Sequence, residues 1–308
     1  MPTFMGTLQL NESGAVEAPA PVAKPTEGTA ATLAPDDVGP LHGRKLETGL
    51  SIVLENVAAG FTKPNILDIK LGAQLYDVND EKQKPEKRAR FDKVSKETTS
   101  GSLGFRIAGM RVWQGPALGA ASELQGKKAE GGDSANDLLE HTSLDADGYR
   151  SYNKIYGRKF SADDIDKGFK EYLIVPSANI TEEKAKIITN LLLKHTLAIQ
   201  QVLEQEESRM FSASILYVYE GDGEAFDATL KANPKLGESI EVGEEETEEE
   251  DDEEEENEAP KPKLVAAKLI DFAHANWVPG QGPDTNSLQG VVSAADILKR
   301  IAGELASK

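Results

Sequence analysis

The chain has 308 residues, no cysteine and a formal net charge of −19 at pH 7. That length allows one or two domains, and the lack of cysteine excludes disulfides, thiolate metal sites and cysteine nucleophiles. No apolar run approaches the roughly 20 residues of a membrane span, and the N-terminus lacks the basic and apolar segments of a secretory signal.

Apolar runs and helical periodicity predict a series of strands and helices that does not alternate strictly, which favours an α+β fold. The predicted strands are 51–57, 66–71, 104–113, 213–219 and 265–272, and the predicted helices are 82–96, 163–172, 181–207 and 287–306. Residues 115–148 are polar and rich in glycine, and predict a loop or insertion.

The helix predicted over 181–207 has the clearest sequence pattern. Thr181 can cap its N-terminus, and two glutamates follow in the first turn, where the helix dipole favours acids. Its apolar residues recur at helical spacing and predict one buried stripe. The stripe consists of Ile188, Leu191, Leu192, Ile199, Val202 and Leu203.

Two segments are too polar or too biased in composition to pack into a core. Residues 11–48 are too polar to pack, and within them residues 14–36 are rich in Ala, Pro, Thr and Gly, so we expect 11–48 to be disordered. Residues 244–258 hold thirteen acids and no base, which leaves a net charge of −6 for the rest of the chain. Such a run repels itself and stays solvated, so we expect a disordered acidic insertion over about 223–262. Binding of histones or other basic partners is the alternative role for it.

The segment Pro64–Gly72 (PNILDIKLG) places an acid and a base on one face of a predicted strand. Side chains alternate along a strand, so Asp68 and Lys70 project from the face opposite the buried leucines. An aspartate can hold a metal ion or orient a hydroxyl group, and a lysine can neutralise a phosphate during its transfer. An ion pair at a sheet edge is the alternative interpretation.

The segment Lys268–His274 (KLIDFAH) ends an apolar strand with Asp271. A carboxylate in that position is costly unless it is paired or bound to a metal. Protein kinases hold Mg²⁺ with an Asp-Phe-Gly segment, but the third residue here is Ala273, so this is a different motif. Either Asp271 caps the next turn, or it completes a Mg-ATP site split between Pro64–Gly72 and Leu269–Ala275.

Residues 81–96 (EKQKPEKRARFDKVSK) form a basic island with seven bases and three acids in an otherwise acidic chain. Clustered lysine and arginine side chains bind phosphate through charge and through multiple donors. Three interpretations stay open from the residues alone: a polyphosphate substrate site, a nuclear-import or nucleic-acid patch, and a solvated helix face. Few aromatic residues interleave with the bases, so stacking on nucleic-acid bases is poorly supported.

Taken together, these segments resemble the inositol polyphosphate kinase family, most closely the fungal inositol polyphosphate multikinases. The resemblance extends from about Ile52 to the C-terminus, and includes an acidic insertion before the last motif. The family motif P-x-x-x-D-x-K-x-G is present as Pro64, Asp68, Lys70 and Gly72, and I-D-F-A-H as Ile270 to His274. The family's Ser-x-Leu-Leu segment resembles Ser214, Ile215 and Leu216, with isoleucine in place of the first leucine. Residues 99–112, 156–158 and 219–222 also resemble fungal members.

The resemblance implies a bilobal kinase with ATP and Mg²⁺ as cofactors, which phosphorylates inositol trisphosphate to the tetrakis- and pentakisphosphates. It implies catalytic roles for Asp68, Lys70 and Asp271, with Asp271 also holding the metal and Asp68 contacting the nucleotide ribose. Glu55 and Val57 would form the hinge that binds adenine through its backbone. Inositol phosphates would contact Lys70, Lys87, Arg90, Lys93, Arg111 and His274.

The residues before the hinge depart from the family pattern. Such kinases have an N-terminal lobe that offers a strand-borne lysine to the ATP phosphates. The lysines before Glu55 are Lys24 and Lys45, and neither lies in an apolar strand. We therefore expect an incomplete N-terminal lobe over 1–57 and a kinase lobe over 58–308. A start at an internal methionine of the family pattern is favoured over genuine loss. We expect the 308-residue chain to bind ATP weakly and to turn over slowly or not at all.

The leading hypothesis is an inositol phosphate kinase. A non-catalytic interaction or transcription-regulatory protein is the alternative, supported by the acidic tract and the incomplete lobe. An acidic chaperone for basic proteins would explain the tract but leave the three motifs unexplained. The resemblance leaves phosphoinositide lipids and transcription-factor partners open, predicts no direct binding of nucleic acid, and implies a location in nucleus and cytoplasm.

Overall fold

The computed structural model describes residues 1–9, 50–81, 83–116, 140–237, 261–277 and 279–307. It divides into two compact units, Met1–Asn56 and Val57–Lys308. The predicted lobes were 1–57 and 58–308. The segment expected to be disordered at 11–48 and the acidic tract 244–258 both lie entirely outside the described residues. Among the described residues, no helix is both long and apolar enough to span a lipid bilayer.

The first unit contains one pair of antiparallel strands in its described part, β1 (Phe4–Gln9) and β2 (Leu50–Leu54). Glu55 follows β2, and its amide donates to the Thr3 carbonyl at 2.9 Å. The Glu55 carboxylate in turn accepts from the Thr3 amide and hydroxyl, each at 3.2 Å. The strand predicted over 51–57 therefore ends three residues early: residues 55 and 56 are irregular, and a turn begins at Val57.

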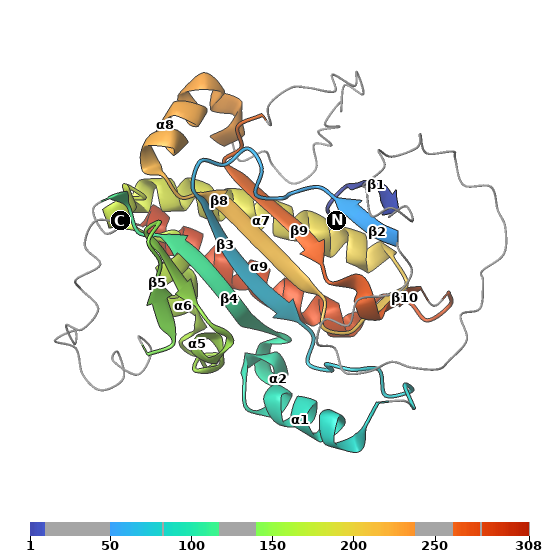
Figure 1. The fold of residues 1–308 in the computed structure, drawn as a ribbon. Helices are drawn as coiled ribbons and strands as arrows, with labels where there is room; N and C mark the ends of the chain where they lie inside the picture. The colour runs from blue at the N-terminus through green and yellow to red at the C-terminus, as the bar shows by residue number, and fades with distance from the viewer. Residues whose placement is uncertain (10–49, 82, 117–139, 238–260, 278, 308) are drawn as a thin grey trace. The chain divides into compact units, whose positions relative to one another are not determined.

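The second unit is built on a six-stranded antiparallel sheet in the order β5-β6-β4-β3-β8-β9 (Figure 1). This confirms the α+β class. The sheet strands are β3 (Pro64–Leu71), β4 (Phe105–Trp113), β5 (Thr142–Leu144), β6 (Tyr149–Tyr152), β8 (Ser214–Glu220) and β9 (Val265–Ile270). A separate pair joins β7 (Ser208–Met210) to β10 (Ala275–Trp277).

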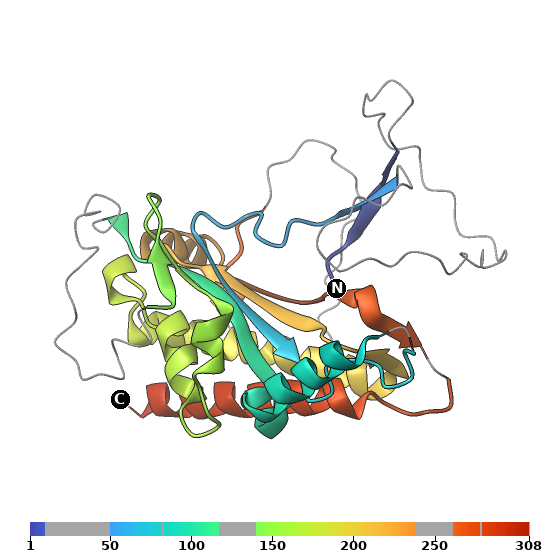
Figure 2. The same cartoon turned by 60° about the horizontal axis from the view of Figure 1, so that its bottom comes forward.

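Helices α7 and α9 run along one face of this sheet (Figure 2). The helices of the unit are α1 (Pro85–Lys96), α2 (Thr99–Leu103), α5 (Lys154–Arg158), α6 (Ile165–Leu173), α7 (Glu182–Gln205), α8 (Gly223–Ala232) and α9 (Thr285–Ala306). Three short 3₁₀ turns are η2 (Pro176–Ala178), η3 (Pro234–Gly237) and η4 (Phe272–His274).

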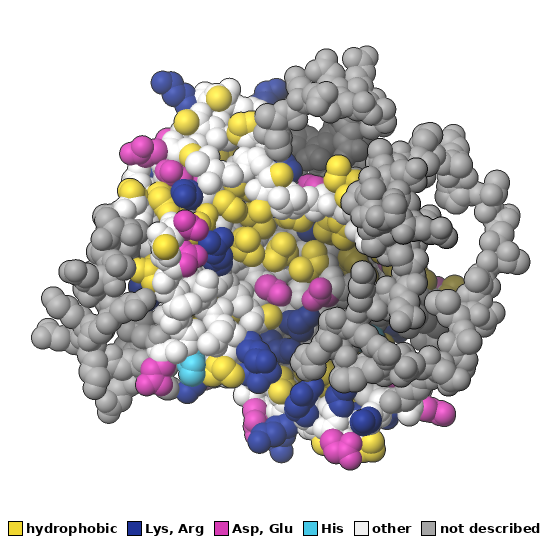
Figure 3. Space-filling model, viewed as in Figure 1, with side chains coloured by type: hydrophobic (Ala, Val, Ile, Leu, Met, Phe, Trp, Pro, Cys, Tyr) yellow, Lys and Arg dark blue, Asp and Glu magenta, His cyan; other side chains and the backbone are white. Residues whose placement is uncertain are grey.

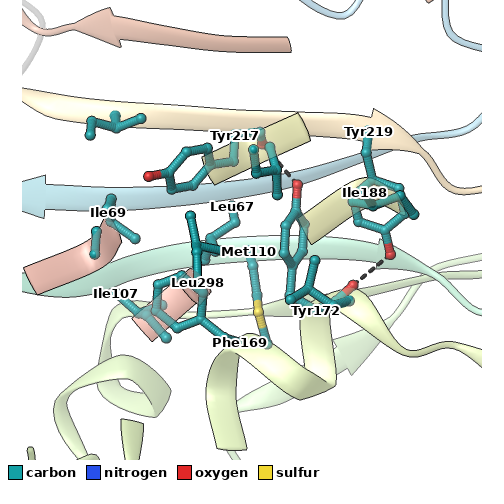
Figure 4. Packing of buried hydrophobic residues seen from close by; sticks show 14 of the residues in the cluster. Leu67, Ile69, Ile107, Met110, Phe169, Tyr172, Ile188, Tyr217, Tyr219 and Leu298 are labelled. Atoms are coloured by element: carbon teal, nitrogen blue, oxygen red, sulfur yellow. Dashed lines mark hydrogen bonds between the residues drawn. The ribbon is translucent and has the colours of Figure 1, made fainter. Parts of the chain in front are cut away.

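Alternation along the strands determines which sheet face is buried. The burial of β3 alternates residue by residue, with Leu67, Ile69 and Leu71 at most 1% exposed. Figure 4 shows two of these leucine and isoleucine side chains packed with residues of β4, β8 and the helices. Tyr172 of α6 lies among them and donates its hydroxyl proton to the Tyr217 carbonyl at 3.1 Å. The opposite face of the sheet is left for the polar side chains of β3.

Helix α7 confirms the capping and most of the predicted stripe. The Thr181 hydroxyl accepts from the Lys184 amide at 3.5 Å, and the glutamates of the first turn follow. Five of the six stripe residues are buried or packed against the core, but Val202 is 56% exposed. Val202 was wrongly assigned because it lies at the margin of the apolar arc, in the last turn of the helix.

Three further predictions need correction. The expected acidic insertion begins later than residue 223, because α8 and η3 occupy 223–237 and Phe226 is fully buried. The expected loop 115–148 contains β5, which pairs with β6. The strand predicted over 265–272 ends at Ile270, because Asp271 adopts a left-handed backbone conformation.

Candidate functional site

The ammonium group of Lys70 is the centre of the candidate site. Its Nζ donates to the Ser212 carbonyl at 2.7 Å and to Asp271 Oδ2 at 2.9 Å. The lysine side chain is 20% exposed and the aspartate 53% exposed. Two of the three predicted catalytic residues, from segments 201 positions apart, are therefore in direct contact.

Both groups that hold Lys70 come from residues with a strained backbone. Ser212 has φ +63° and Asp271 has φ +69°, and such left-handed conformations are rare for residues with a Cβ. The Ser212 hydroxyl donates to the Leu75 carbonyl at 3.1 Å, which fastens this corner to the segment after β3. Strain of this kind persists where surrounding contacts impose it, and it concentrates at functional sites.

Asp68 lies on the same face of β3 as Lys70, two residues earlier. Burial raises the pKa of the Asp68 carboxyl above its ordinary value, while the Ser214 hydroxyl and the Lys70 ammonium oppose that rise. Its Oδ1 atom is buried and has no hydrogen-bond partner within the described part of the chain. A buried carboxylate oxygen without a partner is costly, and this one is available to a ligand or a metal ion.

Arg106 is a site residue that the sequence reasoning missed. It lies directly opposite Lys70 in the β3–β4 register, so the two side chains share a face of the sheet. It is 9% exposed, and its Nη1 donates to the Ser100 hydroxyl at 2.8 Å. Burial, and next the positive charge of Arg158, lower the pKa of Arg106 to about 10. The signal in the sequence was a charged residue near the start of a mainly apolar strand, which also carries Arg111.

The predicted basic island forms α1, which has no buried residue. Pro85 occupies its first turn, where the missing amide proton costs nothing. The helix is attached by the Ser95 hydroxyl, which donates to the Ala73 carbonyl at 2.6 Å, and by the stacked rings of Tyr76 and Phe91. Arg90, Lys93 and Lys96 are exposed, whereas the Arg88 guanidinium donates to the carbonyls of Val78 and Asp80.

The three predicted substrate cations of α1 lie on this exposed helix. The Lys87 ammonium and the Arg90 guanidinium both lie over the Phe91 ring, 5.6 and 5.5 Å from its centroid. Lys93 has Glu97 at 3.9 Å, one turn later. Figure 3 shows Lys and Arg side chains gathered over α1 and the adjoining part of the sheet face. The figure places this basic region next to a hydrophobic patch.

A small apolar cluster includes one predicted hinge residue. Val57 is 7% exposed and packs with Val218 and Ala266, and Phe61, Ile66 and Leu216 surround this group. Ile66 and Leu216 lie on the same sheet face as Asp68, because Asp68 is directly opposite Leu216. The other predicted hinge residue, Glu55, belongs to the first unit, where it contacts Thr3.

Two predicted substrate residues lie at opposite margins of the site. His274 is exposed in η4, and its carbonyl accepts from the Phe211 amide at 3.2 Å, next to Ser212. Arg111 lies opposite Ile66 on β4, and its Nη2 donates to Asp145 Oδ2 at 2.9 Å. The structure therefore gives Arg111 an acidic partner that the sequence did not indicate.

Asp271 and Asp68 are the carboxylates that could hold a divalent cation. In the part of the chain that the structure describes, no group of three or more His, Cys, Asp or Glu residues is arranged around a metal position. Mg²⁺ in kinases keeps several waters and takes only one or two protein carboxylates, besides the nucleotide phosphates. The exposed Asp271 carboxylate and the unpartnered Oδ1 of Asp68 fit that requirement, and the charge of Asp271 is felt at Asp68.

Known proteins are similar to this chain over most of its length. The family model described as inositol polyphosphate kinase matches residues 51–299. The inositol polyphosphate multikinase of Saccharomyces cerevisiae is 33% identical over 311 residues, which cover 97% of this chain and 81% of the relative. That of Schizosaccharomyces pombe is 28% identical over 79% of this chain and 66% of the relative.

A solved structure shares the architecture as well. The inositol phosphate multikinase of S. cerevisiae, crystallised with ADP and Mn²⁺, superposes with a TM-score of 0.63 at 31% identity. The match covers 97% of this chain and 88% of the crystallised one.

Proposed function

Because the chain belongs to the inositol polyphosphate kinase family, we propose that it transfers the γ-phosphoryl group of ATP to hydroxyl groups of inositol polyphosphates, with Mg²⁺ as the metal. The substrates in this proposal are inositol trisphosphate and its tetrakisphosphate product. The single observation that carries it is the Lys70 ammonium, held between the Ser212 carbonyl and the Asp271 carboxylate beside the buried Asp68.

Phosphoryl transfer depends on positioning and on neutralisation of charge more than on covalent chemistry. Lys70 is suited to this because its ammonium is already fixed by two acceptors and can approach a phosphate without a large loss of side-chain freedom. Asp271 and Asp68 would hold Mg²⁺, which when bound offsets negative charge on the phosphates. Asp68 would also contact the ribose.

Nucleotide and substrate would occupy different parts of the open sheet face. The patch around Val57 and Phe61 offers an apolar surface for an adenine ring. A phosphate monoester carries roughly −1.5 to −2 near neutral pH, so an inositol trisphosphate carries about −5. Lys87, Arg90 and Lys93 on the exposed α1 provide a matching concentration of positive charge.

The decisive experiment is phosphorylation of inositol trisphosphate by the purified chain, compared with its Asp271→Asn variant. We expect turnover to fall by about 100- to 1,000-fold, the usual loss when an electrostatic partner of the transition state is removed. Calorimetric affinity for inositol trisphosphate alone should change less than two-fold. Asp296→Asn is the matched control, since Asp296 is an exposed acid on α9.

Two outcomes would contradict the proposal. One is an Asp271→Asn variant with the turnover of the parent chain. The other is a parent chain that neither binds nor phosphorylates inositol phosphates, which would favour the interaction or transcription-regulatory alternative.

A further inference from the structure

Arg111 is held in place on two sides. Its guanidinium carbon lies 3.7 Å from the centroid of the Tyr149 ring, within the range of a strong cation–π contact. Its Nη2 donates to Asp145 Oδ2 at 2.9 Å. Arg111 and Asp145 are 41% and 39% exposed, so water and ligands can reach this pair.

The turn between β5 and β6 fixes the Asp145 carboxylate. Its Oδ1 accepts from the Asp147 amide at 3.0 Å and from the Tyr149 amide at 2.9 Å, while Oδ2 faces Arg111. The hydrogen bond from Arg111, followed by that from the Tyr149 amide, lowers the pKa of the Asp145 carboxyl. Asp145 therefore remains ionised at neutral pH, and it cannot turn away without losing its backbone contacts.

The pair lies close to the candidate site on the open sheet face. Asp68 is opposite Gly109, and Arg111 is two residues further along β4, so Arg111 is a diagonal neighbour of Asp68. Diagonal neighbours on one face are about 7–8 Å apart at Cα, within reach of an arginine side chain. A polyphosphate bound over Asp68 would thus come near Arg111 and its partner Asp145.

We propose that Asp145 is a specificity-determining residue, which competes with the phosphate groups of the substrate for Arg111. This inference rests on the proposed function. Asp145 takes one donor of the guanidinium and Tyr149 covers one of its faces, so a phosphate can use only the remaining edge. A phosphate that binds bidentately to that edge, the strongest mode of arginine toward phosphate, does so beside the fixed negative charge of Asp145.

The competition disfavours the most highly phosphorylated substrates. Each added phosphate contributes roughly −1.5 to −2 of charge, and that charge meets the fixed carboxylate as well as the arginine. Removing the charge of Asp145 should therefore help an inositol pentakisphosphate more than a trisphosphate.

The test compares Asp145→Asn with Asp147→Asn. Asparagine at 145 can still accept from the two turn amides, so the turn is preserved while the charge is removed. Asp147 lies in the same turn and makes no ion pair among the described residues, so its variant removes the same charge from nearly the same place. Calorimetry at fixed salt would measure affinity for inositol trisphosphate and for inositol pentakisphosphate.

We expect Asp145→Asn to tighten trisphosphate binding about two- to five-fold, the range of a partly exposed ion pair, and pentakisphosphate binding further. For each of the two inositol phosphates, Asp147→Asn should change the affinity by less than half as much as Asp145→Asn does. The gain in affinity from Asp145→Asn should disappear in a chain that also carries Arg111→Gln, because both changes act on the Arg111–Asp145 interaction.

Equal effects of the two asparagine variants, a gain that survives Arg111→Gln, or weaker binding by Asp145→Asn would each overturn the inference. If the parent chain binds and phosphorylates inositol phosphates under these conditions, only the inference fails. If the parent chain does neither, the proposed function fails as well.

Discussion

Asp68 shows how a functional residue weakens the fold that carries it. Its carboxyl is largely removed from water, and burial is the main cause of its raised pKa. A carboxyl whose pKa is higher in the folded than in the unfolded state favours folding below the unfolded value, ordinarily 3.8, and loses that contribution as the pH rises. Charged Asp68 is therefore expected to cost stability at neutral pH.

Asp68→Asn should accordingly be at least as stable as the parent chain at pH 7.5, although we expect it to be inactive. The difference in unfolding free energy should shrink as the pH falls through the raised pKa of Asp68, and it should level off below 3.8, where the carboxyl is protonated in both states. Urea denaturation at several pH values would measure it. A variant clearly less stable than the parent at pH 7.5, or a difference that grows toward acid pH, would contradict this explanation.

At the scale of elements, close backbone contacts determine where the short helices lie. Gly157 in α5 is so near β4 that an added Cβ would lie 2.0 Å from the Ile107 carbonyl oxygen. This close contact positions Arg158, the next residue. The charge of Arg158 then acts on Arg106, which lies opposite Lys70. The position of α5 therefore affects the charge distribution behind the candidate site.

Gly157→Ala should destabilise the fold by about 2–3 kcal/mol, because backbone atoms cannot yield as a flexible side chain can. Gly303→Ala is the matched control: Gly303 lies in α9, and an added Cβ there meets nothing within 4 Å. We expect it to stabilise the chain by about 0.5–1 kcal/mol, the usual gain for alanine over glycine in a helix. Equal thermal stability of the two variants would refute the tight contact.

At the scale of the whole molecule, the placement of charge matters more for binding a polyanion than the net charge does. The chain carries −19, yet α1 presents several cations and no buried residue. Exposed charges further apart than about 8 Å are largely screened at physiological salt, so distant acids scarcely weaken a local basic surface. Attraction of a polyanion should depend on α1 and not on the net charge.

A triple variant with Lys87, Arg90 and Lys93 changed to glutamine should bind inositol trisphosphate at least ten-fold more weakly and with less dependence on salt. Its unfolding free energy should change little, because these side chains are not part of the core. The control variant removes the same number of charges from exposed residues elsewhere, with Lys167, Lys231 and Lys235 changed to glutamine. It should have little effect on the affinity for inositol trisphosphate. Similar losses in the two variants would show that net charge governs binding.

Most elements of the second unit were predictable, because their signals are local. Alternating apolar residues predicted β3 and its two faces. A capping residue and apolar residues at helical spacing predicted α7. Asp68, Lys70 and Asp271 were named from the sequence as candidate site residues, and the structure brings Lys70 and Asp271 into contact. Short elements such as β5 and α5 were missed, because three to five residues carry too little periodicity to stand out.

What the sequence determined by itself is the chemistry of the site: an acid and a base on one strand, a second acid after another strand, and a basic helix. What the tertiary structure decided is how these groups are paired. The Ser212 carbonyl holds Lys70, Arg106 lies opposite it, and Asp145 restrains Arg111. Those pairings depend on strand register and on backbone atoms of distant segments, which no local pattern of residue types encodes.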